Sequence, residues 1–280
     1  TAYAIGVRLV GSEMCIRDRK IIKECKNAGA DAVKFQMWRA EDLYKKSHPN
    51  LILHGTIGNF DGLHKGHQAI LSKIKNKAEK TNGYSIVFFT EPHASEYFAA
   101  KDQNSSPPPR ICPWREKVKL LKNFGIDFAF FLEFNKSLKA MTPQTFLDEV
   151  LAQLNLKHLI IGDDFRFGAQ RAGDFALLKN WGNSNGTEVI ANQTVSLNGS
   201  RVSSTRIREA ILQSNFQLAQ ELLGRPYTFS GKVVYGQQLG RTIGVPTANL
   251  WIPKHIEKCQ LLYDLWLILL KLLHLIFFHV

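Results

Sequence analysis

The chain has few cysteines and none of the patterns that give cysteine a structural role. Only four occur among the 280 residues, Cys15, Cys25, Cys112 and Cys259, and no two of them form a Cys-x-x-Cys pair. No histidine cluster has the spacing of zinc ligands either. These absences argue against a structural metal and for a reducing compartment, so we expect a cytoplasmic protein.

Long runs of positive charge are also absent, although the chain is basic overall. The formal net charge is +12, yet no five consecutive residues are Lys or Arg. A basic surface can attract nucleic acid, an anionic membrane or phosphorylated small molecules. Because the lysines of residues 73–80 are predicted to form one solvated helix face, we expect no nucleic-acid partner.

Hydrophobic residues make up 45% of the chain, as in a globular protein of one large or two modest domains. Strand-like and helix-like segments alternate throughout residues 51–195. The predicted strands are 51–58, 85–90, 128–132 and 156–161, and the predicted helices are 67–80, about 115–124 and one opening at Thr142-Pro143, with a proline-rich loop at 101–114. This order predicts an α/β fold with a parallel sheet, which binds ligands at the carboxyl ends of its strands.

The segment Gly58-Asn-Phe-Asp-Gly-Leu-His-Lys-Gly-His67 leads from the first of these strands into the first helix. Gly66 lets the backbone approach a ligand closely, and His64 and His67 can donate ring N–H groups to phosphate oxygens. The start of the following helix directs free N–H groups and its positive dipole end at the same anion. The segment therefore favours a nucleotide phosphate site, with two histidines in an ordinary polar turn as the alternative.

A second polar segment, Gly162-Asp-Asp-Phe-Arg-Phe-Gly168, follows the strand at 156–161. Asp164 and Arg166 bring a carboxylate and a guanidinium to the carboxyl end of that strand, and a guanidinium suits phosphate. The rings of Phe165 and Phe167 can line a pocket for a flat heterocycle or can be buried in the core.

A third segment, Val202-Ser-Ser-Thr-Arg-Ile-Arg-Glu209, has hydroxyl groups at a predicted helix start. Such hydroxyls cap free N–H groups. The same helix start can instead hold a phosphate, with Arg208 reaching inward.

These motifs, together with Gly240-Arg-Thr-Ile-Gly-Val-Pro-Thr-Ala-Asn249, occur in the order of a known family. Residues 51–250 resemble the bacterial bifunctional riboflavin kinase/FMN adenylyltransferases, also called FAD synthetases. The resemblance implies a Rossmann-like nucleotidyltransferase domain that transfers AMP from ATP to FMN, giving FAD and pyrophosphate, followed by a riboflavin kinase barrel. One departure is Phe89-Thr-Glu-Pro-His-Ala94, where the family usually has Thr-Phe-Glu-Pro-His-Pro.

The resemblance also implies roles for particular residues. The expected catalytic residues are His64, His67 and Arg208. The expected nucleotide and flavin contacts are Asn59, Asp61, Gly66, Asp164, Arg166, Ser204 and Thr205. Thr247 and Asn249 would hold Mg²⁺ and the ATP phosphates in the kinase barrel. The implied ligands are thus ATP, Mg²⁺, FMN and, for the kinase, riboflavin.

The two ends of the chain do not fit this family. We predict a foreign segment at 1–50, a nucleotidyltransferase domain at 51–222, a truncated kinase fragment at 223–255 and an aberrant apolar tail at 256–280. Residues 20–45 resemble a piece of the sialic-acid synthase family, and residues 261–280 contain 16 apolar residues. A tail of that length suits a membrane helix, but Asp264 and Lys271 make it a costly one, so we expect a frame-shifted terminus, with a genuine amphipathic or membrane segment as the alternative. We expect no membrane partner unless the tail is genuine.

The incomplete barrel predicts that riboflavin kinase activity is lost. Only Glu257 and Asp264 follow Asn249 as acids, in a sequence unlike the family's. Two alternatives for the whole chain remain open. One is an inactive fragment that binds a nucleotide or flavin, and the other is a nucleotidyltransferase for a different phosphorylated substrate.

Overall fold

The computed structural model describes residues 51–102, 106–162 and 164–228, together with four short strands outside these ranges. Seven strands form the main sheet, in the spatial order β1-β2-β5-β4-β3-β6-β7. Their bounds are β1 Ile5–Val7, β2 Val33–Phe35, β3 Leu53–Ile57, β4 Tyr84–Glu91, β5 Phe128–Glu133, β6 Leu156–Gly162 and β7 Glu188–Asn192. Every neighbouring pair in this sheet is parallel, which confirms the predicted α/β fold.

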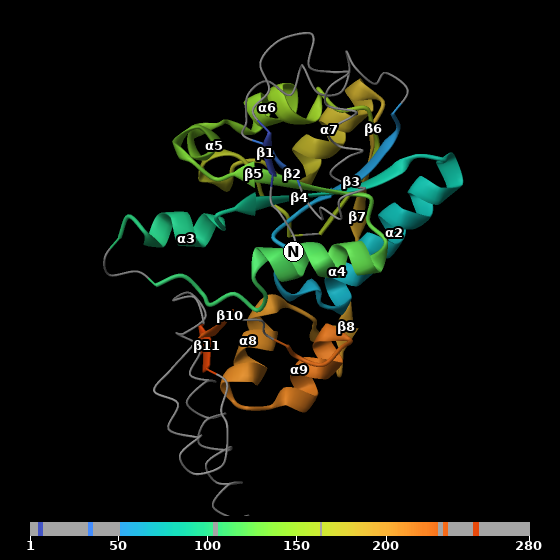
Figure 1. Cartoon of the computed structure of the whole chain (residues 1–280). Coiled ribbons are helices and arrows are strands. Elements are labelled where there is room, and N and C mark those ends of the chain that lie inside the picture. Colours follow the sequence, from blue (N-terminus) through green and yellow to red (C-terminus); the bar gives the residue numbers. More distant parts are fainter. Residues whose placement is uncertain are drawn as a thin grey trace, which may run out of the picture.

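Helices connect these strands and lie on both sides of the sheet (Figure 1). They are α2 Lys65–Thr81, α3 Ala94–Ala99, α4 Trp114–Phe124, α5 Lys136–Ala140, α6 Pro143–Phe146 with the π-helical turn η3 Leu147–Leu151, and α7 Phe175–Asn185. Polar side chains accept hydrogen bonds at several helix starts: Asn135 caps α5, Thr142 caps α6 and Asp174 caps α7. Pro143 stands in the first turn of α6, as predicted.

Two apolar cores lie on opposite faces of the sheet because side chains alternate along each strand. On β4, Ile86 and Phe88 pack in one core with η3 and α7, and Val87 and Phe89 pack in the other with α2 and α4. The central strands of the sheet are thus packed against apolar side chains on both faces.

A third core joins the last two helices, α8 Ser204–Leu212 and α9 Phe216–Leu223, below α4 in Figure 1. Ile111, from the loop before α4, is buried in this core with Ile207 and Leu222. Gln68 of α2 donates to the carbonyl of Leu223 at 2.8 Å. These contacts bring the start of α8 toward the loop that precedes α2.

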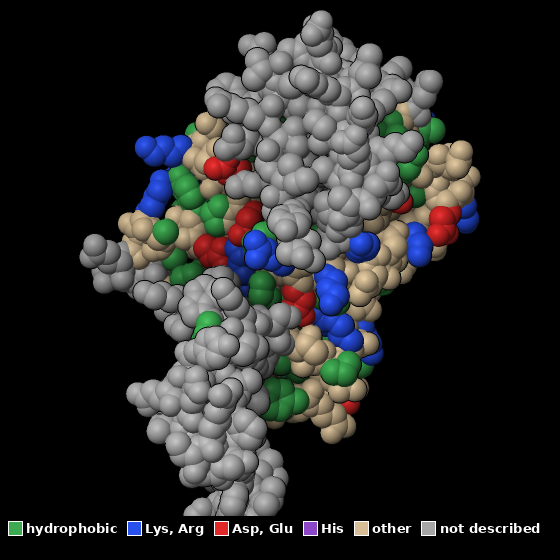
Figure 2. Space-filling model, viewed as in Figure 1, with side chains coloured by type: hydrophobic (Ala, Val, Ile, Leu, Met, Phe, Trp, Pro, Cys, Tyr) green, Lys and Arg blue, Asp and Glu red, His purple; other side chains and the backbone are tan. Residues whose placement is uncertain are grey.

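The predicted kinase fragment at 223–255 contains a short antiparallel pair of strands, β10 Lys232–Val234 and β11 Asn249–Trp251. The apolar tail at 256–280 lies outside the described residues. Among the residues that are described, no helix is both long and apolar enough to cross a membrane. On the face seen in Figure 2, Lys and Arg side chains intermix with Asp and Glu over the middle of the molecule.

Candidate nucleotide-binding site

A tight turn joins β3 to α2 and carries the first predicted motif. It contains the short 3₁₀ turn η2 (Asp61–Leu63) and three residues with left-handed backbone, Phe60 (φ 48°), Gly62 (φ 79°) and Leu63 (φ 41°). A side chain at Gly62 would also come within 2.8 Å of Ile111. Left-handed backbone at Phe60 and Leu63 is strained, and such strain is concentrated at binding sites.

His64 and His67 lie together at the start of α2, which begins two residues earlier than predicted. The His64 ring caps the helix, because its Nδ1 accepts the backbone N–H of His67 at 3.3 Å. The two rings stack with centroids 3.6 Å apart. Since Nδ1 of neutral His64 is an acceptor, its proton is carried by Nε2, which is the ring's donor.

Burial keeps both imidazoles neutral at physiological pH. It lowers the pKa of His64 to about 4, outweighing the opposing effect of Asp61. Burial, together with His64 and Lys117, holds the pKa of His67 well below its usual value. Each ring therefore offers an anion a single N–H donor rather than a full positive charge.

The start of α8 comes close to this turn. Ser203 caps α8 by accepting the N–H of Arg206 at 3.2 Å, and the hydroxyl of Ser204 donates to the backbone carbonyl of Asp61 at 3.0 Å. A side chain at Gly66 would come within 3.1 Å of the His64 ring and 3.4 Å of the Val202 carbonyl oxygen. Two helix N-termini, those of α2 and α8, thus lie at one place, as the phosphate prediction requires.

Asp61 links the turn to α8 and to the loop before α4. Its buried carboxylate accepts the N–H groups of Ile111 and Cys112 at 3.1 and 3.2 Å. Arg208 of α8 donates to the same carboxylate at 2.5 Å and to the Pro109 carbonyl at 2.7 Å. Arg208 therefore points toward the turn, and its partner in this structure is a carboxylate, while its contact with phosphate stays a prediction.

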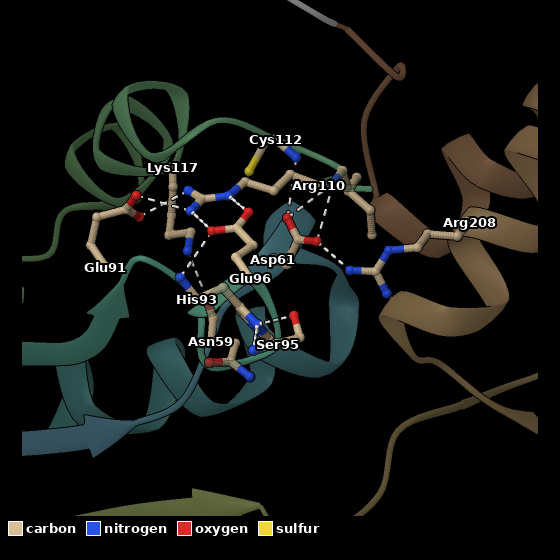
Figure 3. A network of polar contacts seen from close by, with 11 residues as sticks. Asn59, Asp61, Glu91, His93, Ser95, Glu96, Arg110, Cys112, Lys117 and Arg208 are labelled. Atoms are coloured by element: carbon tan, nitrogen blue, oxygen red, sulfur yellow. Dashed lines mark hydrogen bonds and ion pairs between the residues drawn. The ribbon is translucent and has the colours of Figure 1, made fainter. Parts of the chain in front are cut away.

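A cavity of about 190 Å³ opens beside these groups. Four predicted site residues line it, Asn59, Asp61, Ser204 and Arg208. The other lining residues were not predicted: His93, Ser95, Glu96, Pro108 and Arg110. Figure 3 shows that side chains reach the site from the turn after β3, from the segment between the end of β4 and α3, from the loop before α4 and, with Arg208, from α8.

Arg110 is the centre of the unpredicted part of the site. Its guanidinium binds Glu91 through two hydrogen bonds, of 2.8 and 2.9 Å, and also binds both oxygens of Glu96 in α3 (Figure 3). Burial disfavours ionisation of Glu96, but the hydrogen bonds from Arg110 outweigh it and lower the pKa of Glu96. Arg110 therefore fastens α3 to the end of β4.

His93 begins α3 and lines the same cavity. Its Nδ1 accepts the backbone N–H of Ser95 at 3.2 Å, and Glu96 accepts the N–H of His93 at 3.0 Å. Burial and the nearby Lys117 lower the pKa of His93, so its ring is also neutral. This segment contains Ala94, the departure noted in the sequence.

The second predicted motif does not line this cavity. Asp164 pairs with Arg201 at 2.9 Å and Arg166 with Asp174 at 3.3 Å, both on the exposed surface. The ring of Phe167 is buried in the core beside Phe146, the alternative foreseen for it. Thr205 is exposed on α8. Thr247 and the side chain of Asn249 lie outside the described residues.

A family model for FAD synthetase matches residues 46–206, and one for riboflavin kinase matches residues 223–273. The chain belongs to the FAD synthetase family. The first of these matches covers the whole β3–α2 turn and the start of α8. The second contains Thr247 and Asn249 and extends beyond residue 255.

Relatives named bifunctional riboflavin kinase/FMN adenylyltransferase support this membership. The protein of Escherichia coli K12 is 41% identical over 209 residues, which are 74% of this chain and 66% of the relative. The protein of Haemophilus influenzae is 38% identical over 76% of this chain and 70% of its own length. The chain thus spans about two thirds of these relatives. The resemblance of residues 20–45 to sialic-acid synthases stays a prediction.

A solved structure shares this fold. The crystal structure titled macrolide-efflux protein from Streptococcus pneumoniae superposes with a TM-score of 0.65 at 30% identity. The match covers 79% of this chain and 70% of that one.

Proposed function

We propose that the chain is an FMN adenylyltransferase, which transfers AMP from ATP to FMN and releases pyrophosphate. The observation that carries this proposal is the meeting of α2 and α8 at one turn, within the segment that the FAD synthetase family model matches. FMN and ATP are the substrates that the family implies, with the flavin nucleotide as the acceptor.

The residues in and next to the cavity suit this chemistry, although His64 and His67 lie beside it and do not line it. The attacking FMN phosphate is already an anion, so the reaction needs no general base. It needs its two anions held in line and the developing charge stabilised. The Nε2–H of His64, the ring of His67, the N-termini of α2 and α8, and Arg208 are the groups that we assign to this task.

Mg²⁺ would enter with the ATP phosphates, which supply part of its oxygen shell. Among the described residues no three His, Cys, Asp or Glu side chains gather as metal ligands. Asp61 and Glu96, the carboxylates at the cavity, are both bound to arginines. The described residues therefore do not form a preformed metal site. Thr247 and Asn249 stay predicted Mg²⁺ ligands of the kinase part. When bound, Mg²⁺ neutralises phosphate charge.

The test is to incubate the full chain with FMN, ATP and Mg²⁺ and to measure FAD and pyrophosphate. Equal amounts of both products are expected. Binding of FMN without any FAD would support the inactive-fragment alternative, and turnover of another phosphorylated acceptor would support the other alternative.

The variant His67→Ala tests the phosphate role within this assay. Removing one preorganised donor from a transferring group typically lowers kcat by roughly 10²–10³-fold. His158→Asn is the matched control, because His158 is also buried but lies in β6 toward the opposite end of the sheet. An undiminished kcat in H67A would remove His67 from the mechanism.

We also propose that the chain lacks riboflavin kinase activity and acts in the cytoplasm. The first statement rests on the sequence after Asn249, where Glu257 and Asp264 are the only acids, although the riboflavin kinase match extends over both. The second rests on the lack of any Cys-x-x-Cys pair among the four cysteines of the sequence. Formation of FMN from riboflavin and ATP by the pure chain would overturn the loss of the kinase.

A further inference from the structure

Helix α4 places a lysine in the interior of the protein. Lys117 is only 4% exposed, whereas Lys119, two residues further along the helix, is exposed. A lysine stem is long enough for its ammonium group to reach water in most settings, and burying that charge costs free energy. The position of Lys117 therefore needs a compensating interaction.

The ammonium group of Lys117 contacts the turn that carries the first motif. Its Nζ donates to the backbone carbonyl of Asn59 at 2.7 Å and lies 4.5 Å from the centroid of the Phe89 ring. Asn59 directly precedes Phe60, where the backbone becomes left-handed. Figure 3 shows Lys117 reaching from α4 toward this turn. The hydrogen bond fixes the peptide at which the strained turn begins.

The surroundings of Lys117 connect two parts of the site. Six ionisable groups interact electrostatically with Lys117, so that one changes the pKa of the other. They are Asp61 in η2, His67 in α2, Glu91 in β4, His93 at the start of α3, and Arg110 and Cys112 in the loop before α4. Burial is the main cause that lowers the pKa of Lys117, and Asp61, Glu91 and Cys112 oppose it. His67 and His93 belong to different segments, yet the same charge lowers the pKa of both.

We propose that Lys117 is a positioning residue of the nucleotidyl-transfer site, pinning the Asn59 peptide and supplying a fixed positive charge between the η2 turn and the His93 segment. The role rests on the proposed function. It acts through Asn59 and the two imidazoles rather than through contact with a substrate, since Lys117 does not line the cavity described above.

The first measurement is the steady-state formation of FAD by Lys117→Met and Lys117→Arg, with Lys119→Met as the matched control on the same helix. K117M loses both the donor and the charge, so we expect its kcat to fall at least tenfold with a smaller change in the KM for ATP. K117R keeps a donor and the charge and should recover part of that loss. K119M should behave as the wild type.

The second measurement is the titration of the histidine side chains by NMR, which requires no turnover. Burial is the larger cause of the low pKa of His93 and remains in every variant, so the loss of the neighbouring charge should raise this pKa only in part in K117M and leave it unchanged in K117R and K119M. Protonation at Nδ1 would remove the acceptor for the Ser95 N–H, so the acid limb of kcat should move to higher pH in K117M as well.

Two results would overturn the proposal, namely wild-type kcat in K117M or an unchanged His93 titration. Should K117M not fold, Lys117→Gln retains an N–H donor without the charge and carries the same measurements. A wild-type chain that makes no FAD would refute the proposed function, and the titration would still decide whether Lys117 sets the charge of this site.

Discussion

At the scale of single residues, both arginines of the cavity are already bound to carboxylates. Arg110 is held by Glu91 and Glu96, and Arg208 is held by Asp61. The neutral donors of the site, the imidazoles and helix N-termini, can meet a phosphate without breaking an ion pair. Arg208 uses its Nε for the Pro109 carbonyl and one Nη2–H for Asp61, so it can turn its remaining N–H groups toward a phosphate, whereas Arg110 has Nε, Nη1 and Nη2 all engaged by Glu91 and Glu96. We therefore assign Arg110 to shaping the cavity and Arg208 to binding.

This difference makes a prediction for Arg110→Lys. A lysine is a point donor and cannot bind two carboxylates in the forked geometry of a guanidinium. The α3 wall of the cavity should loosen while the N-termini of α2 and α8 stay in place. Since the N-termini of α2 and α8 are the groups that we assign to the ATP phosphates, we assign the α3 wall to FMN. We expect the KM for FMN to rise about tenfold, equivalent to about 1.4 kcal/mol, with a smaller change in the KM for ATP.

Arg115→Lys is the control, because Arg115 is exposed on α4 beyond the cavity. Thermal unfolding of both variants separates a loosened wall from a loss of folded protein. If R110K kept the wild-type KM for both FMN and ATP, the contacts of Arg110 with Glu91 and Glu96 would not shape the cavity.

At the scale of elements, the start of α8 divides two tasks between adjacent serines. Ser203 caps the helix, and Ser204 ties the helix to the Asp61 carbonyl at the cavity. Ser203→Ala should lower the free energy of unfolding by about 1 kcal/mol, the usual cost of a lost N-cap. Ser204→Ala should lower kcat/KM for ATP by a larger factor than Ser203→Ala does. Urea unfolding and initial rates on the same two variants check this, and equal kinetic losses would contradict the division.

The elements with an apolar face could be predicted from the sequence. The 3.6-residue repeat of Ile70, Ile74 and Ala78 predicts α2, and all three side chains are buried. Helix α3 has no buried residue, so its sequence has no repeating apolar face from which a helix could be predicted. The short helix α5 buries only Leu138, and a single apolar position does not predict a helix either.

The site was predictable where its residues are adjacent in sequence. The turn from Asn59 to His67 and the start of α8 are short motifs whose chemistry is local. Arg110 lies 19 residues from Glu91, and Lys117 lies 58 residues from Asn59. Nothing local marks such pairs, because only the fold brings them together. Arg110 follows three prolines in a predicted loop. Nothing in the sequence distinguishes Lys117 from the exposed lysines of the same predicted helix.

At the scale of the whole molecule, buried neutral histidines lie in two distant regions of the domain. His64, His67 and His93 belong to the site. His54 of β3 and His158 of β6 form a second group, with 2.7 Å between their Nδ1 atoms. His54 also contacts the Thr81 hydroxyl at 2.6 Å, and His158 contacts Glu188 at 3.1 Å.

These histidines predict a loss of stability in mild acid. Burial lowers the pKa of both His54 and His64 from 6.5 to about 4, and His158 and the charge of Lys77 add to the effect on His54. The unfolded chain therefore binds protons at pH 5 that the folded chain does not. Above pH 6.5 each imidazole is neutral in both states and its burial carries no proton penalty. As the pH decreases from 6.5 toward 4, the unfolded chain gains the proton first, so the free energy of unfolding falls. Between pH 7.5 and 5 the loss is about 2 kcal/mol for each group.

Urea unfolding at pH 7.5 and at pH 5 measures this loss while most carboxylates remain ionised. His54→Gln removes one titrating group away from the site, so its free energy of unfolding should fall by about 2 kcal/mol less over the same interval. Ser72→Ala, an exposed and non-titrating change on α2, is the control and should keep the full pH dependence. If H54Q lost as much stability in acid as the control, the pair in β3 and β6 would not be the acid-labile part of the fold. The loss would then have to be assigned to the histidines of the site, His64, His67 and His93, and FMN or ATP at saturating concentration should protect the chain from it.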